Sequence, residues 1–545
     1  MTRPATTPTN WIDRAVASVA PAFALRRAIA RNRLNRILDG GGARAHSAIG
    51  GGRNRTDFIT TSASPDSMIY SDIEKLRNQV RQREYEDGTV RGPIKRIVNN
   101  VVGRGILFQA AVKADESGFE FFPSIDDVMA ARWNFYLEHY WRLWVKAENA
   151  DVKVTSSFHE IQKQVQGALI RDGESIVVVR ESNRRNRLIP VCLEVLEADR
   201  LFTPPGEITN PLVRNGIRFD SEGAPAAYYL LKHHPGDRHF FQTGSYLDFD
   251  EVPAFNANGT RRVLHLFDLM RPEQTRGFSE FAPALKDLQD LDRYEEAEKF
   301  AAIEDACMMG FVKSANPNEY QAATTEADPG SDRRLHDFDI GMIHYLAPGE
   351  EMDIHRPKRP NDQFEKFTAA LTRGPANALD MPPEVLSQNW AGMNYSNART
   401  VLLQWHLSCR MRQQFLFTHL CDPVADIACR QFVARGLIPD SRGFDRRPAD
   451  FLRRRWQPGG WEWVDPTKEA QGKQMELDGN FATLASVCAE KGEDWEEVLE
   501  QRAREAIKIR DIEEKHDIKL STAAPATAET PAEDMDDEDK KAANA

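Results

Sequence analysis

The chain has 545 residues, of which 28% are charged and 41% hydrophobic, and its formal net charge is −12. This length suffices for two to four domains with a buried core, and the composition is ordinary for a soluble globular protein. The negative balance excludes a surface that is cationic throughout, and no run approaches the roughly 20 apolar residues of a membrane helix. The six cysteines form no CxxC pair, which fits a reducing compartment and no thiolate metal site.

Residues 1–63 are unlike a folded domain, because they combine many arginines with few acids and two GGG runs. Two interpretations stay open: a solvated linker, or a basic arm that docks on a partner or on nucleic acid. The apolar run 15–25 resembles a signal-peptide core, but it is short, is broken by Pro21 and follows Asp13. We therefore expect a protein that is made in the cytoplasm.

Apolar periodicity predicts an ordered region that begins near Ser64 and mixes helices with strands. Helices are expected over 65–82, 92–102, 125–145 and 157–171. Strands are expected over 106–112, 175–180, 189–196, 217–219, 227–231 and 262–267. We expect Pro93 in a first helical turn, and we expect the aromatic residues of 125–145 to form a core or an interface. The GxG at 103–105 precedes a strand and lacks a third glycine, so it is no dinucleotide fingerprint.

Four acids flank these strands, namely Asp172, Glu174, Glu197 and Asp199. Paired carboxylates are typical of general acid–base catalysis. No nucleophile or histidine accompanies them in the sequence, and acids are common in turns beside strands. We therefore interpret the four as structural residues.

A polar loop with Arg271 and Arg276 leads into the longest predicted helix, 279–309. Ser279 can cap this helix, and Pro283 is tolerated in its first turn. Its apolar stripe narrows from leucine to alanine, at Leu285, Leu288, Leu291, Tyr294, Ala297, Ala301, Ala302 and Ala306. Taken alone, the stretch indicates a long core helix of a large protein, with a stripe thin enough for close packing against similar helices.

A small β unit is expected next, with strands over 341–346 and 351–355. Its histidines and acids are His336, Asp337, Asp339, His344 and His355. They match no metal-ligand spacing, so alternation along short strands explains them better than a metal site does.

The rest of the chain is predicted to be mainly helical. Pro382 and Pro383 separate a short helix, 361–374, from a polar loop, 386–394. Asn394 or Ser396 then caps a long helix that reaches about residue 420. Further helices are expected over 423–435, 466–478, 483–491 and 495–508. The acidic, low-complexity stretch 521–545 is expected to be disordered.

Seven segments in a fixed order carry a family resemblance. They are IVNNVVGRGILFQ (97–109), RDGESIVVV (171–179), LEVLEADRL (193–201), HLFDLMRPEQTRGFSEFAPAL (265–285), NYSNAR (394–399), WVDPTKE (463–469) and GEDWEEVLEQ (492–501). Over about 64–508 the chain thereby resembles the portal proteins of lambda-type tailed bacteriophages. None of the segments is a catalytic signature.

The resemblance implies an α+β subunit with a mixed α/β wing, a two-helix stem, a small β-containing clip, a tunnel loop with a long helix, and a helical crown. The implied boundaries are a flexible arm at 1–63, the wing at 64–278, the stem helices at 279–309 and 361–375, the clip at 310–360, the tunnel loop at 376–395, the long helix and the rest of the wing at 396–465, the crown at 466–510, and a disordered acidic tail at 511–545.

The resemblance also implies partners and a location. Portal proteins form dodecameric rings at one capsid vertex, and double-stranded DNA passes through the channel without sequence specificity. The expected partners are further copies of the chain, the terminase large subunit, the major capsid and scaffold proteins, and the head–tail connector, with no membrane. The expected location is the virion, after assembly in the host cytoplasm.

Two sets of residues are candidates for these roles. The channel set lies in the tunnel loop and comprises Ser387, Gln388, Asn389, Trp390, Gly392, Met393 and Asn394. The intersubunit set comprises Arg271, Arg276, Ala297, Ala301 and Arg399. For Arg271 and Arg276, pairing with an acid of the same chain is an equal alternative. We expect no catalytic residue, cofactor or metal; the competing hypotheses are a packaging-associated nuclease or protease, and a monomeric DNA-binding scaffold.

Overall fold

The computed structural model describes residues 64–69, 72–115, 124–184, 186–237, 248–306, 310–314, 350–354, 364–461 and 466–519. The chain divides into two units, residues 1–68 and 69–545. The described part of the first unit belongs to α3 (Pro65–Ile69). The arm predicted at 1–63, the histidines of 336–355 and the tail after 519 lie outside the described residues.

Five helices of the second unit precede strand β2 (Glu174–Glu181). They are α4 (Ile73–Glu86), α5 (Gly88–Val101), α6 (Asp127–Trp144), α7 (Ala147–Ala150) and α8 (Phe158–Arg171). Helix α8 starts with a capping box, in which Ser157 and Glu160 bond each other's backbone N–H groups. The sequence prediction for α8 is therefore confirmed.

Two helix predictions in this region are wrong. The single helix expected over 65–82 is instead α3 and α4, separate elements. Helix α5 starts at Gly88 and not at 92, because the Asp87 carboxylate accepts a hydrogen bond from Thr89 N and caps it there. Pro93 consequently lies inside α5 and not in its first turn.

The strands form small antiparallel sheets. A three-stranded sheet has the order β3-β2-β8, and a four-stranded sheet has the order β4-β5-β6-β7. Their strands are β2 (Glu174–Glu181), β3 (Val191–Leu196), β4 (Val213–Arg214), β5 (Ile217–Phe219), β6 (Pro225–Leu231), β7 (Phe249–Pro253) and β8 (Val263–Phe267). In the first sheet, Ile176 of β2 lies opposite Leu196 of β3 and His265 of β8. The mixture of helices and antiparallel sheets confirms the α+β class.

A further pair of strands was only half predicted from the sequence, because one of its two strands was missed. Strand β1 (Leu107–Ala110) pairs with β11 (Arg454–Gln457), which places Phe108 opposite Trp456. Strand β11 has only four residues, and two of them are arginines, so no apolar alternation in the sequence favoured a strand there.

The main core is aromatic and lies where α6, α8 and β1 meet. Trp133, Trp141, Trp144 and Phe158 are all buried, and Phe108 stacks on Trp141 with ring centroids 4.9 Å apart. This confirms the core interpretation of the aromatic residues in α6, although Phe135 on the same helix is exposed. Burial of rings this large is a main source of stability in such a core.

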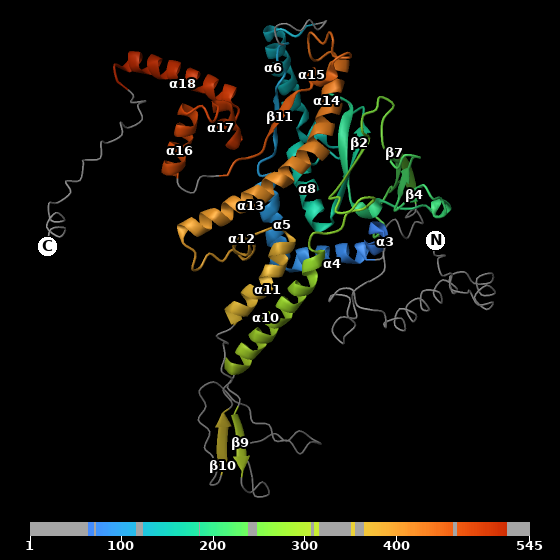
Figure 1. Ribbon diagram of the computed structural model, residues 1–545, viewed down its shortest axis with the longest axis vertical. Coiled ribbons are helices and arrows are strands. Elements are labelled where there is room, and N and C mark those ends of the chain that lie inside the picture. Colours follow the sequence, from blue (N-terminus) through green and yellow to red (C-terminus); the bar gives the residue numbers. More distant parts are fainter. Residues whose placement is uncertain are drawn as a thin grey trace, which may run out of the picture. The chain divides into compact units, whose positions relative to one another are not determined.

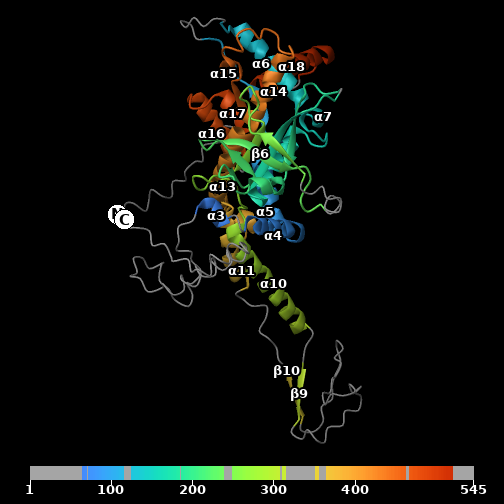
Figure 2. The same cartoon turned by 90° about the vertical axis from the view of Figure 1, so that its right-hand side faces the viewer.

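Helices α10 (Leu285–Ala306) and α11 (Phe364–Ala378) lie side by side, as Figures 1 and 2 both show. Tyr294 of α10 joins them, with ring centroids 5.7 Å from Phe364 and 4.5 Å from Phe367. Strands β9 (Gly310–Ser314) and β10 (Glu350–Ile354), which lie between these helices in sequence, pair antiparallel.

The start predicted for α10 is wrong. A short 3-10 turn, Ala282–Ala284, precedes it, so the α-helix begins at Leu285 and not at Ser279. Ser279 is buried instead, and its hydroxyl donates to the carbonyl of Ile170 at the end of α8. Its polar group therefore fastens the segment before α10 to α8.

After α11 the chain is mainly helical, with a loop at 388–394 and a longer non-helical stretch at 435–447. The elements are α12 (Pro383–Ser387), α13 (Tyr395–Leu416), a π-helical turn (Phe417–Cys421), α14 (Asp422–Ala434) and α15 (Pro448–Phe451). The predicted break between two helices near residue 420 is replaced by this π turn, because the helix absorbs the change without interruption (Figure 1). Asn394 caps α13 by accepting from Asn397 N at 2.9 Å, as predicted.

The last helices are α16 (Pro466–Asp478), α17 (Leu484–Glu490) and α18 (Trp495–His516). Helix α18 passes residue 510, so the boundary expected between the helical region and a disordered tail is wrong by at least six residues. Within the described ranges, no helix is long and apolar enough to cross a membrane. Five cysteines of the described chain are buried and unpaired: Cys192, Cys409, Cys421, Cys429 and Cys488.

Candidate functional site

The loop between α12 and α13 contains the residues expected to line a channel. Gln388 closes α12 in the left-handed region (φ 57°), and Gly392 has φ 77°, a value that glycine adopts readily. Residues 387–392 and Asn394 are exposed, and Met393 is half-buried. No charged residue occurs between Glu384 and Arg399. The structure therefore brings the seven candidates together in one exposed, uncharged segment.

The polar side chains of this loop also hold its shape. The Ser387 hydroxyl donates to Pro383 O at 2.8 Å, and Asn389 Oδ1 accepts from Ala391 N at 3.0 Å. Such local bonds are the usual way in which serine and asparagine fix a turn. The loop is thus defined by its own side chains, a feature that its composition alone only suggested.

Both ends of the loop are fastened to helices. At one end, Arg96 of α5 donates to Leu386 O at 3.1 Å, and burial lowers the pKa of this guanidinium. At the other end, Asn394 caps α13. The loop therefore has fixed attachment points on both sides.

One arginine of α13 ties together the helices around this loop. Arg412 donates to both carboxylate oxygens of Glu280, at 2.6 and 2.7 Å, and to Leu379 O at 2.9 Å. Glu280 precedes α10 and Leu379 follows α11, so the start of α10, the end of α11 and the C-terminal part of α13 meet at the Arg412 guanidinium, which pairs bidentately with Glu280. Sequence reasoning missed Arg412, because its partner lies 132 positions away.

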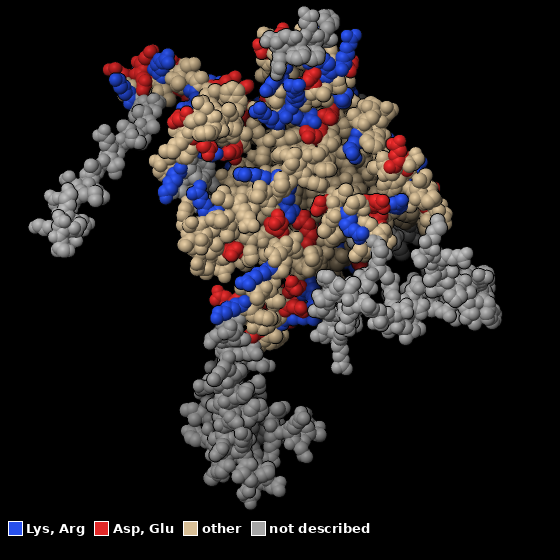
Figure 3. Space-filling view, viewed as in Figure 1, with Lys and Arg blue, Asp and Glu red and all other residues tan. Residues whose placement is uncertain are grey.

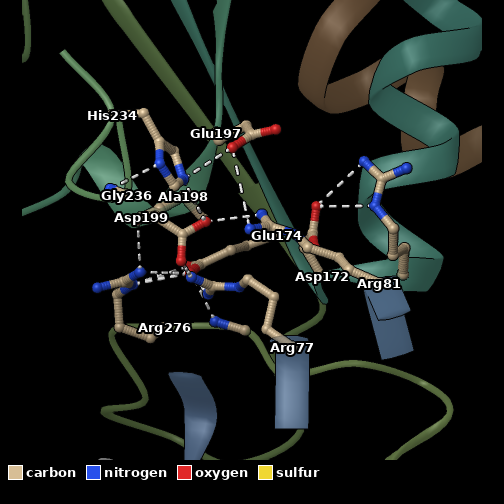
Figure 4. A network of polar contacts seen from close by, with 12 residues as sticks. Arg77, Arg81, Asp172, Glu174, Glu197, Ala198, Asp199, His234, Gly236 and Arg276 are labelled. Carbon is tan, nitrogen blue, oxygen red and sulfur yellow. Dashed lines mark hydrogen bonds and ion pairs between the residues drawn. The ribbon is translucent and has the colours of Figure 1, made fainter. Parts of the chain in front are cut away.

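A second set of buried charges holds the loop that precedes α10, and we call it the Glu174 cluster: Arg77, Glu174, Asp199, His265 and Arg276. Figure 4 labels all of these residues except His265. Glu174 Oε1 accepts from Arg77 at 2.7 Å and from Arg276 Nε at 2.9 Å. Its Oε2 lies 2.9 Å from His265 Nε2. One fully buried carboxylate therefore joins α4, β2, β8 and the loop before α10.

Neighbouring contacts extend the Glu174 cluster. Arg77 also donates to Asp199 at 3.1 Å, and Arg276 donates to Ala198 O at 3.0 Å. Arg81, one turn along α4, bonds Asp172 at 2.7 Å. All four acids that the sequence singled out are therefore close together, as Figure 4 shows.

The electrostatics of the cluster favour charged carboxylates. Burial alone would raise the pKa of Glu174, but the charge of Arg276 and the hydrogen bonds from His265 and Arg276 lower it well below its ordinary value. Burial likewise opposes ionisation of Asp199, and Arg77 and Arg81 outweigh it, so its pKa is also lowered. Glu174 and Asp199 therefore stay ionised and form ion pairs with the arginines.

The ion pairs of the four acids argue against a role for them in acid–base catalysis. Asp172, Glu174 and Asp199 each contact an arginine at 3.1 Å or less. Glu197 is half-exposed, and its closest charged contact is His234 at 3.0 Å. A general acid or base must exchange a proton near the working pH, and the lowered pKa values of Glu174 and Asp199 oppose this for those two residues.

Glu197, Asp199 and His234 are near enough to one another to suggest a metal site. Two observations argue against one. Gly236 N donates to His234 Nδ1 at 3.0 Å, so the neutral ring carries its proton on Nε2, the nitrogen that faces the acids. Arg81 also lies 2.7 Å from Asp199 Oδ2 and already neutralises it. We therefore assign these residues to the ion-pair network.

The intersubunit candidates lie in different surroundings. Arg276 is buried and bonded to Glu174 of its own chain, which is the second of the two roles open for it. Arg271 and Ala297 are exposed, and Ala301 and Arg399 are half-buried. Ala297 therefore does not face α11 of its own chain, and Phe300 and Ile303 beside it are also exposed.

Charge is mixed over the surface. On the face seen in Figure 3, basic and acidic side chains occur in small interspersed groups with uncharged surface between them. That face carries no broad field of one sign that would attract nucleic acid by itself.

Known proteins match this chain over most of its length. The family model described as phage portal protein, lambda family, matches residues 51–413. The chain is 28% identical to the probable portal protein of Halomonas phage phiHAP-1 over 457 residues, which is 81% of this chain and 82% of the relative. It is 22% identical to portal protein B of Escherichia phage lambda over 366 residues, 62% of this chain and 66% of that protein.

A solved structure also aligns with the chain. It is the neck of a native gene transfer agent particle computed with C12 symmetry, with 13% identity, coverage of 77% of this chain and 93% of that one, and a TM-score of 0.40. The family assignment rests on the sequence matches. The chain belongs to the lambda family of phage portal proteins.

Proposed function

We propose that copies of this chain form a closed ring, dodecameric by family resemblance, at one capsid vertex, and that double-stranded DNA enters and leaves through its channel. In this proposal α10 and α11 form the stem, β9 and β10 belong to the clip, and the tunnel loop at 376–395 includes the channel residues of 387–394. The three-stranded and four-stranded sheets and α4–α8 belong to the wing, and α16–α18 form the crown.

The observation that carries the proposal is the uncharged, exposed loop held at both ends. Every phosphate that a cation neutralises releases counterions and tightens binding, so a conduit must offer DNA few cations. The loop offers none between Glu384 and Arg399. Its anchors on Arg96 and Asn394 keep it in place against a moving duplex.

The proposal includes partners and a location. The ring docks the terminase large subunit during packaging and the head–tail connector afterwards, and it contacts the major capsid and scaffold proteins. It resides in the virion after assembly in the host cytoplasm. Its role is structural and not catalytic, which the arginine-bound state of Asp172, Glu174 and Asp199 supports.

Imaging of the purified full-length protein tests the assembly. We expect negative-stain images of closed rings with a central hole, and a particle mass twelve times that of the chain. A protein that stays monomeric at all concentrations, also with its capsid partners present, would contradict the proposal.

A loop variant tests the channel. Ala391 is exposed and contributes only its backbone N–H to the loop, so Ala391→Lys adds a cation without removing a side-chain bond. Rings of this variant should bind duplex DNA with a steeper dependence on salt than wild-type rings. The control is Ser221→Lys, at an exposed turn before β6. Equal salt dependence in the two variants would exclude the loop from the channel.

A further inference from the structure

Helices α17 and α18 are held to the rest of the second unit by few contacts. Helix α18 has no buried residue, and α17 buries Cys488. Segments with so little apolar burial open at low free-energy cost. The polar contacts at this contact surface therefore decide how firmly the two helices are held.

These polar contacts centre on three carboxylates and one arginine. Gln109 of β1 donates to Asp494, the N-cap residue of α18, at 2.9 Å. Arg142 of α6 contacts Glu497 of α18 and lies 3.5 Å from Glu138, one turn back on its own helix. Glu138 Oε1 accepts from Ala110 N at 2.9 Å. A cavity of about 650 Å³ lies between these elements.

Glu138 is the carboxylate whose charge is most strained by this arrangement. Burial raises its pKa to about 7, the Ala110 N–H opposes the rise, and the charges of Asp494 and Glu497 add to it. Its side chain is 18% exposed, whereas those of Arg142 and Glu497 are more than 60% exposed. An exposed ion pair such as Arg142–Glu497 contributes little stability by itself. A charge on Glu138 therefore has a large effect on how firmly α18 is held to α6.

The other charged groups that line this cavity do not replace Glu138 in this role. Helix α8 contributes His159, whose pKa burial lowers, so that it is neutral near pH 7. The segment from 493 onward contributes Glu493, Arg502 and Glu505 at the edge of the same cavity. Strand β1 contributes no charge, and Arg455 of β11, opposite Gln109, is exposed.

We propose that ionisation of Glu138 releases α17 and α18 from α6 and β1 as the pH rises through neutrality. Below that point Glu138 is uncharged, and Arg142 is available to Glu497. Above it, a third negative charge faces Asp494 and Glu497, and Glu138 competes with Glu497 for Arg142. The proposal does not depend on the ring or on the DNA channel.

The size of the effect follows from the two pKa values of Glu138. If the released state has the ordinary value of 4.5 and the docked state about 7, docking weakens about tenfold between pH 6 and pH 8. The sign is that of an acid whose pKa is raised in the docked state: docking is strongest at low pH and declines as the pH increases from 4.5 to 7.

Hydrogen exchange of the full-length protein measures this directly. With exchange times corrected for the intrinsic pH dependence, peptides covering 484–516 should lose about tenfold in protection between pH 6 and pH 8. Peptides from α8 and β2 should not change. Glu138→Gln keeps the acceptor for Ala110 N and cannot ionise, so its peptides should stay protected at pH 8. The matched control is Glu148→Gln, at an exposed carboxylate of α7, which should behave as wild type.

Two results would overturn the proposal: wild-type protection that is equal at both pH values, or Glu138→Gln that loses protection as wild type does. A second variant tests the assignment of the proton. Asp494→Asn keeps a good N-cap and removes one charge beside Glu138, so the midpoint of the transition should move to lower pH. An unmoved midpoint would show that the titrating group is not Glu138.

Discussion

At the scale of single residues, Glu174 is the carboxylate that joins the buried charges of its cluster. It is fully buried, and Arg77, Arg276 and His265 all contact it within 3 Å. Such a carboxylate contributes less as an attractive pair than as a group whose removal leaves buried cations without a partner. The contribution of Glu174 to stability is therefore best measured by substituting it.

Glu174→Gln should reduce the free energy of unfolding by about 3–5 kcal/mol, because it removes the buried carboxylate charge that Arg77 and Arg276 share. Urea denaturation followed by tryptophan fluorescence measures the loss. Glu197→Gln is the control, because the Glu197 side chain is 54% exposed and lies 3.9 Å from Arg81 and 3.0 Å from His234. We expect its free energy of unfolding to change by less than about 1 kcal/mol. Similar losses in the two variants would show that the Glu174 cluster is not a stabilising centre.

The same residue predicts an acid-labile fold. The pKa of Glu174 is lower in the folded than in the unfolded chain, so the unfolded chain binds more protons once the pH falls below about 4.5. The stability that Glu174 provides is complete above that pH and is lost as the pH falls toward its folded pKa. Urea midpoints at pH 7, 5, 4 and 3 should therefore decline more steeply for wild type than for Glu174→Gln. Parallel curves would contradict this assignment.

Sequence reasoning reached some of these residues and not their connections. It singled out Asp172, Glu174, Glu197 and Asp199 as structural, and it left open whether Arg276 pairs within the chain. It could not join them, because the partners of Glu174 lie about a hundred positions away on each side. Ion pairs of this range depend on the fold, and no local pattern encodes them.

At the scale of elements, the helices with strong caps and wide apolar faces were predictable. Helix α8 and the start of α13 agree with the sequence, because Ser157 and Asn394 are capping residues in capping positions. The start of α10 was misplaced, because Ser279 has the same chemistry as a cap but bonds to Ile170 of α8. The same hydroxyl also accepts from Phe281 N at 3.1 Å, which fixes the turn before α10 and not the first turn of the α-helix.

Two glycines allow the close approach of β2 and the loop before α10. A Cβ on Gly173 would lie 2.0 Å from the carbonyl carbon of Phe278, and Gly173 has φ +83°. A Cβ on Gly277 would lie 2.1 Å from Gly173 O. The two backbones are therefore in direct contact, next to the Glu174 cluster.

Gly173→Ala should cost about 3 kcal/mol or more, since it combines an unfavourable backbone conformation with a clash against another backbone. Gly223→Ala is a matched control: it has φ +87° with no atom near the new Cβ, so it should cost only about 1–2 kcal/mol. Thermal unfolding of both variants measures the difference. If the two glycines gave equal losses, the close approach would have no energetic role.

At the scale of the whole molecule, the sequence predicted the order of the elements better than their surroundings. The succession of a long helix, a shorter helix, a loop and a second long helix is present as α10, α11 and α13. Of the two strands expected between α10 and α11, the one over 351–355 matches β10, the one over 341–346 lies outside the described residues, and β9 was missed. Which surfaces are used between copies is a different question. Exposure within one chain identifies candidates but does not name the surface that covers them.

Ala297 provides a test of the proposed ring at this scale. It is exposed in the single chain, whereas Ala301 is half-buried, so a tryptophan at 297 leaves the fold of one subunit intact. Ala297→Trp should reduce the fraction of closed rings in negative-stain images if α10 meets a neighbouring copy there. Ser221→Trp adds the same bulk at an exposed turn and should assemble normally. Normal rings from both variants would place the contact elsewhere.

The Glu174 cluster also sets an order of events during synthesis. Arg77 and Glu174 are separated by 97 positions, and Glu174 and Arg276 by 102. A chain that leaves the ribosome from its N-terminus can join the first pair long before the third residue exists. Contacts between residues so far apart in the sequence form late in folding, because closing the intervening chain into a loop costs conformational entropy. The loop before α10 can therefore be joined to Glu174 only after the three-stranded and four-stranded sheets have been synthesised.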